Sequence, residues 1–133
     1  MRTFKVETEA QVQAIDITGK VDSEVAAAGV GDGAILVYCP HTTAGIYVNE
    51  GHDPDVATDV MGALEKLVPR NGPYRHAEGN SAAHIRSILT GNGCLLPVLG
   101  GRTVIGTWQR IFFAEFDGPR TRTVQVHFLG GGR

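Results

Sequence analysis

A chain of 133 residues can form one domain around one core but is too short for two ordinary domains, so we expect a single domain over residues 1–133. Its 12 Lys and Arg and 14 Asp and Glu give a formal net charge of −2 without any run of like charges, which excludes a general nucleic-acid-binding surface. No apolar run approaches the about 20 residues that span a bilayer, and the polar start has no signal sequence, so we expect a cytoplasmic protein without a membrane partner.

The first third of the chain predicts two strands and a short helix. Residues 3–9 and 11–18 alternate between apolar and polar side chains, which is typical of adjacent strands with one wet face, and we expect them to form a hairpin. Asp22 or Ser23 is then expected to cap an Ala-rich helix that ends at Gly29.

The next segment predicts two strands joined by a polar turn. Residues 34–39 are continuously apolar, which indicates a strand covered on both faces, and Ile46 and Val48 share one face of the strand that follows. Cys39 and Cys94 are far apart and lie in apolar surroundings, so we expect two reduced, buried thiols.

A helix is predicted to begin at Asp53, whose carboxylate can cap free amides while Pro54 occupies the first turn. It should run to about Val68 and end before Pro69. Its apolar residues recur at helical spacing and should form a buried stripe: Val56, Val60, Leu64 and Leu67.

A second helix should begin at Ser81 and end at Gly91, with an apolar inner face formed by Ile85, Ile88 and Leu89.

The C-terminal part of the chain predicts strands. Residues 95–98 form one, and residues 104–117 form a long strand that is apolar on both faces and therefore central. After a turn at residues 117–119, residues 120–129 should pair back on the central strand.

Three polar, glycine-punctuated blocks, residues 41–50, 74–84 and 106–122, predict one shared functional site. Neutral imidazoles suit divalent transition metals, and three of them with one open position make a catalytic metal site. His41, His76 and His84 are the candidates, although no local histidine motif supports them and each could be an ordinary hydrogen-bonded histidine.

Carboxylates and arginines extend this candidate site. Glu50 and Asp59 could bind a metal ion or act as acid or base groups. Glu115 lies on the predicted central strand and needs a partner such as Arg120 or Arg122, so it is either catalytic or one half of a buried ion pair. The two arginines are one residue apart and could grip a phosphate together, or form salt bridges between subunits.

The order and spacing of these blocks resemble the YjbQ family, described as secondary thiamine-phosphate synthases, over almost the whole chain. The residues that carry the resemblance are His41-Thr-Thr-Ala, Asn49-Glu50, Asp53-Pro54, Asp59, Tyr74-x-His76, Glu78-Gly79, His84-Ile85, Leu96-Pro97-Val98, Gly106-Thr-Trp-Gln109 and Glu115. The resemblance implies an α+β fold of two mostly antiparallel, sandwich-like β-sheets with peripheral helices, assembled as a homotrimer.

The resemblance also implies a reaction, in which hydroxymethylpyrimidine diphosphate and a thiazole phosphate are joined with release of pyrophosphate. A divalent cation, Mg²⁺ or Zn²⁺, and arginines would neutralise the diphosphate. The expected catalytic residues are Glu50, His84 and Glu115; the expected metal ligands are His41, His76 and His84; the expected substrate-binding residues are Asn49, Asp59, Asn80, Trp108, Gln109, Arg120 and Arg122.

Two other functions fit the same residues. One is a metal-dependent hydrolase or phosphatase, in which His41, His76 and His84 activate water on a small phosphorylated metabolite. The other is a trimeric protein that binds such a metabolite without turnover.

Overall fold

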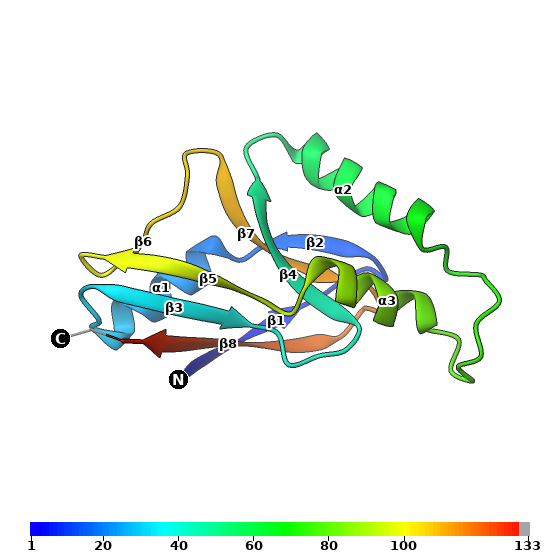
Figure 1. Cartoon of the computed structure of the whole chain (residues 1–133), viewed down its shortest axis with the longest axis horizontal. Coiled ribbons are helices and arrows are strands. Elements are labelled where there is room, and N and C mark those ends of the chain that lie inside the picture. The colour runs from blue at the N-terminus through cyan, green and yellow to red at the C-terminus, as the bar shows by residue number, and fades with distance from the viewer. Residues whose placement is uncertain (131–133) are drawn as a thin grey trace.

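The computed structural model describes residues 1–130, which form two antiparallel sheets with helices at their periphery (Figure 1). In chain order the elements are β1 (Arg2–Glu7), β2 (Gln13–Asp16), α1 (Thr18–Ala28), β3 (Gly33–Tyr38), β4 (Ala44–Glu50), α2 (Pro54–Leu67), α3 (Ser81–Thr90), β5 (Gly93–Leu99), β6 (Arg102–Thr103), β7 (Gln109–Glu115) and β8 (Thr121–Leu129). The larger sheet has the order β1-β8-β3-β5-β6 and the smaller sheet β2-β7-β4. The predicted α+β class with two antiparallel sheets is confirmed.

The main core contains side chains from both sheets. Ile35 and Val37 from β3 are fully buried, as are Ile111 and Phe113 from β7. Along β8, every second residue is buried from Arg122 to Val126, which is the period expected when one face of a strand packs on a core. Arg122 therefore occupies a position at which the alternation along β8 predicts an apolar side chain.

The predicted N-terminal hairpin is wrong, because β1 pairs with β8 in the larger sheet while β2 pairs with β7 in the smaller one. Each strand turns its apolar face to the shared core, and the alternating pattern alone does not say which sheet supplies its partner. The chain changes sheets after β1, where Thr8 donates its backbone N–H to the Arg120 carbonyl at 2.9 Å. Helix α1 begins at Thr18, earlier than the predicted cap, and ends at Gly29 as expected.

The expected return of residues 120–129 onto the central strand is also wrong. β7 pairs with β2 and β4, whereas β8 pairs with β1 and β3, so the turn after β7 carries the chain between sheets. The predicted strand 104–117 is shorter than expected, since β7 spans Gln109–Glu115 and a loop precedes it.

Helix α2 follows its prediction closely. The Asp53 carboxylate accepts a hydrogen bond from the Asp55 N–H at 2.9 Å, and the helix ends at Leu67, before Pro69. The apolar stripe is only partly covered, because Met61 is the one buried residue of this helix and Leu67 is exposed.

Helix α3 is turned the other way from the prediction. Ile88 is 78% exposed, and Ile85 and Leu89 are exposed beside it. The buried face consists of small or polar residues: Ala82, Ala83, Arg86 and Ser87. Asn80 rather than Ser81 stands at the cap position, without a side-chain capping bond.

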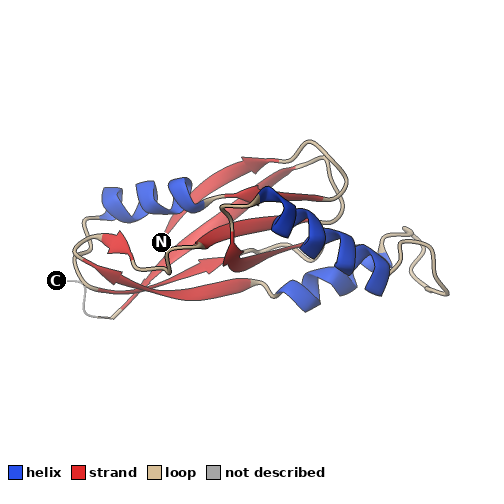
Figure 2. Ribbon diagram, turned by 90° about the horizontal axis from the view of Figure 1, so that it is seen from above, coloured by secondary structure: helices blue, strands red, loops and turns tan. Residues whose placement is uncertain are grey.

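Close approach to β4 explains this orientation of α3. The Ser87 hydroxyl donates to the Ala44 carbonyl at 2.6 Å, and a Cβ at Gly45 would lie 2.0 Å from the Thr90 hydroxyl oxygen. A helix that lies so near a strand must present small side chains to it, which leaves its large apolar residues outside. Figure 2 shows α2 and α3 near one end of the strands and α1 near the other.

The outer face of the larger sheet is uncharged at its centre. Across β5, β3 and β8, cross-strand neighbours form three rows: Gly93, Tyr38 and Gln125; Leu95, Leu36 and His127; Pro97, Ala34 and Leu129. Leu95, Leu99 and Leu129 are exposed. At the rim, the Val104 N–H donates to the Pro97 carbonyl at 2.9 Å. Within residues 1–130, no helix has the length and apolar character needed to cross a membrane.

Candidate functional site

Three separate segments meet in one polar pocket of about 440 Å³. The turn after β3 supplies His41, the segment that leads into α3 supplies His76 and His84, and the chain at the start of β8 supplies Arg120 and Arg122. The other lining residues are Pro40, Thr42, Thr43, Glu78 and Asn80. The structure therefore brings together all three predicted histidines and both predicted arginines.

His41 is held as a neutral imidazole by the strand beside it. Its Nε2 accepts a hydrogen bond from the Thr123 backbone N–H at 2.9 Å, which assigns the ring proton to Nδ1. Burial and the nearby Arg122 guanidinium lower the pKa of His41 below its ordinary value. At neutral pH this residue is uncharged and its Nε2 lone pair is already used.

His76 and His84 face each other edge to face, with ring centroids 5.5 Å apart. The His76 Nε2 also lies 3.8 Å from a carboxylate oxygen of Glu78. His84 lies in the first turn of α3 and is partly buried, whereas His76 is exposed on the preceding loop. This pair gives the pocket two ring systems that can donate to or accept from a polar ligand.

The pocket does not contain a preformed three-ligand metal site. In the part of the chain that the structure describes, no three His, Cys, Asp or Glu side chains are placed to hold one ion. The Nε2 atom of His41 is occupied by Thr123, so His76 and His84 are the two histidines of the pocket that remain to share a ligand. The expected set of His41, His76 and His84 thus lines one pocket without fitting one metal ion in a single chain.

A buried ion pair between Glu115 and Arg122 supports the pocket. Glu115 is 0% exposed and Arg122 is 4% exposed, and they join the smaller sheet to the larger one. The Arg122 Nε donates to one Glu115 oxygen at 2.8 Å, and its Nη2 donates to the other. Glu115 also accepts from the Thr8 hydroxyl at 2.8 Å and from the Asp117 N–H at 3.0 Å.

These contacts set the charge of Glu115. Burial raises its pKa, but the Arg122 hydrogen bonds and charge, with those of Asp117 and Thr8, outweigh burial and hold the pKa below its usual value. Arg122 also donates to the Thr43 hydroxyl at 2.9 Å, next to His41 in sequence. The pair therefore positions the turn that carries His41 and has no free lone pair with which to act on a substrate.

The two arginines do not form the forked phosphate clamp that their spacing suggests. Arg122 is engaged with Glu115, whereas Arg120 donates from Nη2 to an Asp117 carboxylate oxygen at 2.9 Å. The same oxygen accepts from the Asn80 side-chain amide at 2.9 Å. Arg120 remains half exposed at the pocket, so it is the arginine that can reach a ligand.

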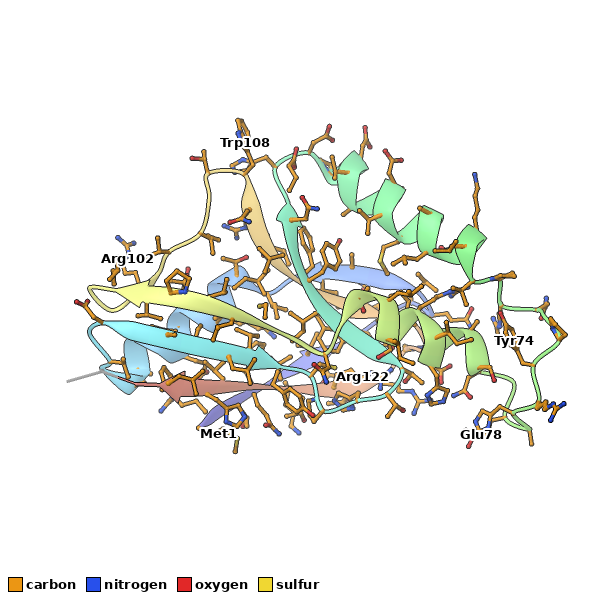
Figure 3. The ribbon with its side chains drawn as sticks, in the orientation of Figure 1. Met1, Tyr74, Glu78, Arg102, Trp108 and Arg122 are labelled. Atoms are coloured by element: carbon orange, nitrogen blue, oxygen red, sulfur yellow. The ribbon has the colours of Figure 1, made fainter. Side chains whose placement is uncertain are left out.

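The site residues expected in the third block, residues 106–122, lie at two opposite ends of the smaller sheet. In the register of β4 and β7, Ala44 lies opposite Glu115 and Glu50 lies opposite Gln109. The seven residues of β4 separate these ends by about 20 Å. Figure 3 shows Trp108 and Arg122 well apart in the molecule.

At the far end, the expected site residues have local structural roles. Glu50 accepts from the backbone N–H groups of His52 and Asp53, at 2.8 and 2.9 Å. The Gln109 side chain accepts from the Gly106 N–H at 2.7 Å, and Trp108 is 61% exposed against the ring of His52.

Two further substrate-binding candidates do not reach the histidine pocket either. The Asn49 side chain accepts from the N–H of the next residue at 2.7 Å, and Asp59 is exposed on α2. Five of the expected site residues therefore lie outside the pocket of a single chain: Asn49, Glu50, Asp59, Trp108 and Gln109.

Sequence reasoning missed the two threonines of the buried network. Thr8 and Thr43 are buried, and both bond to the Glu115 and Arg122 pair. Thr43 belongs to the His-Thr-Thr segment and could have been found from it, whereas nothing near Thr8 in the sequence indicates its role. A second depression of about 550 Å³ shares His41, Thr42 and His84 with the pocket and extends along α3 to Ile88.

Comparison with known proteins identifies a family. The sequence model of the family described as "UPF0047 protein YjbQ-like" matches residues 2–131. The UPF0047 protein YugU of Bacillus subtilis is 44% identical over 131 residues, covering 98% of this chain and 99% of the relative. A UPF0047 protein of Methanocaldococcus jannaschii is 43% identical over 127 residues, covering 96% of this chain and 92% of the relative.

Solved structures agree with this assignment. A crystal structure of a YjbQ/UPF0047 family protein from Clostridium acetobutylicum superposes with a TM-score of 0.94 at 46% identity, covering 97% of this chain and 100% of that one. A protein from Aeropyrum pernix superposes with a TM-score of 0.92 at 41% identity, covering 98% of each chain. The matches in sequence and fold extend over nearly the whole chain, and the protein therefore belongs to the YjbQ/UPF0047 family.

Proposed function

We propose that the protein is a transferase of the thiamine-phosphate synthase type, and that the histidine pocket binds its phosphorylated substrates. The observation that carries the proposal is the convergence of His41, His76, His84 and Arg120 on one polar pocket of about 440 Å³. This volume lies within the usual range for small-molecule sites.

The reaction would join hydroxymethylpyrimidine diphosphate to a thiazole phosphate. A carbon–nitrogen bond forms to the thiazole nitrogen as the carbon–oxygen bond to the diphosphate breaks, and the bonding electrons leave with pyrophosphate. The site must hold the two substrates in line and stabilise the departing charge.

The residues of the pocket suit these tasks to different degrees. Arg120 can donate to phosphate oxygens, and the uncapped start of α3 adds backbone N–H groups that lack intrahelical partners. We assign His84 as the proton donor to the leaving group, because it is partly buried in the first turn of α3, beside the ring of His76. Glu115 serves as a positioning residue in this scheme, and Glu50 has no place in it.

The test is synthesis of thiamine phosphate from the two substrates with Mg²⁺ present, using protein purified from a host that lacks the unrelated barrel synthase. We expect product with the wild type and a loss of at least about 100-fold in kcat/KM with His84→Ala. His127→Ala is the matched control, because His127 lies on the outer face of the larger sheet and should retain activity. No product from folded wild-type protein would refute the synthase proposal.

The same assay separates the two alternative functions. Release of phosphate or pyrophosphate without thiamine phosphate would indicate a hydrolase, for which His76 and His84 are the available pair. Saturable binding of the thiazole phosphate without any turnover, weakened by Arg120→Ala, would indicate a binding protein.

We also propose that the chain assembles as a homotrimer in the cytoplasm. Support comes from the exposed Ile88 and Leu89 of α3 and from the uncharged outer face of the larger sheet, since soluble monomers rarely expose large apolar patches. Cys39 and Cys94 are free thiols, which suits a reducing compartment. Light scattering should give three times the chain mass for the wild type and a lower mass for Ile88→Glu, and a wild-type monomer would refute the trimer.

A further inference from the structure

A small polar cavity of about 70 Å³ lies where the chain around the start of α3 meets the turn after β7. Two arginines line it, Arg70 and Arg86, and neither of them lines the histidine pocket. Its volume is far below that of pockets for organic molecules and corresponds to a few water molecules or one small ion. The cavity therefore suits an inorganic ligand.

Arg86 is a buried cation without a counter-charge. It is 4% exposed, and no carboxylate of residues 1–130 forms an ion pair with it. Its Nε and Nη2 donate to the Val68 carbonyl at 3.0 and 2.8 Å. Val68 is the C-terminal cap of α2, so this carbonyl offers only the partial negative charge of a helix end. Much of the arginine charge is left uncompensated, whereas buried charges are normally paired.

The cavity offers three hydrogen-bond donors to a ligand. The Arg86 Nη1 donates to no described residue and, unlike the Oδ1 atom of Asn80, is not fully enclosed by protein atoms. Arg70 adds a second guanidinium, which is exposed and bonded to the Gln11 side chain. The N–H of Ala82, in the first turn of α3, has no acceptor among residues 1–130. Two guanidinium groups and a helix amide form the kind of donor set that binds oxyanions.

The two carboxylates that line the same cavity do not cancel its positive charge. The Asp117 carboxylate accepts from the Arg120 Nη2 at 2.9 Å, which offsets its charge. The Glu78 side chain is 75% exposed, on the loop that extends from the body of the molecule (Figure 3), so solvent screens its charge. Arg70 and Arg86 therefore set the charge inside the cavity.

We propose that this cavity binds one inorganic oxyanion, such as phosphate. Its oxygens accept from the Arg86 Nη1, from Arg70 and from the Ala82 N–H, and its charge balances the arginine that the chain leaves unpaired. The three donors lie outside the histidine pocket, so this proposal and the transferase proposal can fail independently. The small volume favours a free anion over the phosphate group of a metabolite, whose organic body has no room there.

An amide NMR titration of the isotope-labelled full-length protein with sodium phosphate tests the proposal, with sodium chloride used to hold the ionic strength constant. Phosphate should shift the Gly79 and Ala82 signals along one saturable curve. Phenyl phosphate carries the same charged group on a ring and should shift these signals with at least about tenfold lower affinity. Absence of saturable shifts at both amides, or equal affinity for the two anions, would overturn the proposal.

Arginine variants provide the second arm of the test. Arg86→Met should weaken phosphate binding at least about tenfold by removing a buried charged donor, and Arg70→Met about threefold, as expected for an exposed charge. Arg75→Met is the matched control, because Arg75 is exposed on the same loop, lines neither space and should not affect binding.

Circular dichroism checks the fold of each variant, and the comparison of Arg70→Met with Arg75→Met decides the question if Arg86→Met does not fold. Unchanged phosphate affinity in a folded Arg86→Met variant, or equal affinities of Arg70→Met and Arg75→Met, would overturn the proposal.

Discussion

Replacing Arg122 with Met should cost about 3 to 5 kcal/mol of unfolding free energy, because it leaves a charged partner without compensation in the core. The Glu115 carboxylate would keep the Thr8 hydroxyl and the Asp117 N–H but lose both guanidinium bonds, at a position with no exposed surface. Met retains the apolar stem of arginine, so little of the loss would come from a cavity. With a urea slope of about 2 kcal/mol/M, the midpoint should fall by about 2 M.

The measurement is urea unfolding followed by far-ultraviolet circular dichroism at a fixed protein concentration. Glu115→Gln should lose a similar amount, since it leaves the Arg122 charge unpaired. The double variant Glu115→Gln/Arg122→Met should lose clearly less than the sum of the two single variants, because neither charge remains. A loss below about 1 kcal/mol for Arg122→Met, or strict additivity in the double variant, would refute the reasoning.

Acidification should change the contribution of Glu115 to stability in opposite directions in the wild type and in Arg122→Met. In the wild type the pKa of Glu115 is lowered, so its contribution to stability is present above the pKa of the unfolded chain and is lost as the pH falls through the folded value. In Arg122→Met the buried carboxylate has lost its cation, so we expect its pKa to rise and the deficit relative to the wild type to shrink on acidification.

Three further predictions concern single side chains. The pKa of His41 is lower in the folded chain than in the unfolded chain, so its contribution to stability is complete above about pH 6.5 and is lost as the pH falls. The urea midpoint of the wild type should therefore fall between pH 7.5 and 5.5, and His41→Asn should make this fall smaller. Tyr47→Phe should leave the free energy of unfolding unchanged or raise it by up to about 1 kcal/mol, because the buried Tyr47 hydroxyl has no hydrogen-bond partner among the described residues. A clear drop in Tm would contradict this prediction. Asp53→Ala should cost about 1 kcal/mol by removing the cap of α2, whereas Asp53→Asn should cost much less; equal losses would argue against capping.

The sequence predicted the elements of the fold better than their partners. Helix α2 was predicted nearly to its ends, because Asp53 and Pro54 act through local hydrogen bonding and backbone geometry. The pairing of β1 and β2 was not, because alternation identifies an inward face without identifying a sheet. Helix α3 was misoriented because its contact with β4 selects small residues, a choice set by the distance between two elements.

For the candidate site, too, the sequence predicted some residues correctly and misplaced others. The predicted histidines and arginines do converge, since His41, Arg120 and Arg122 lie beside strand ends, His84 lies in the first turn of α3 and His76 lies on the loop before it. Glu50 and Trp108 do not join them, because β4 and β7 place sequence neighbours of the site at the opposite end of an extended strand. Proximity in sequence overestimates proximity in space when the intervening residues form a strand.

The position of Pro97 on β5 limits how copies of this chain can meet. A residue in a strand directs its N–H and C=O to the same side, and the Pro97 carbonyl accepts from Val104 on the rim, so the missing N–H also belongs to the rim side. Val104 and β6 already cover the rim beside residues 97–99, and a strand added beside residues 93–95 would find no N–H donor at Pro97, which protects this edge against open-ended stacking of chains. Growth into fibres is discouraged at that edge, while the flat outer face beside it stays available for an assembly that closes on itself.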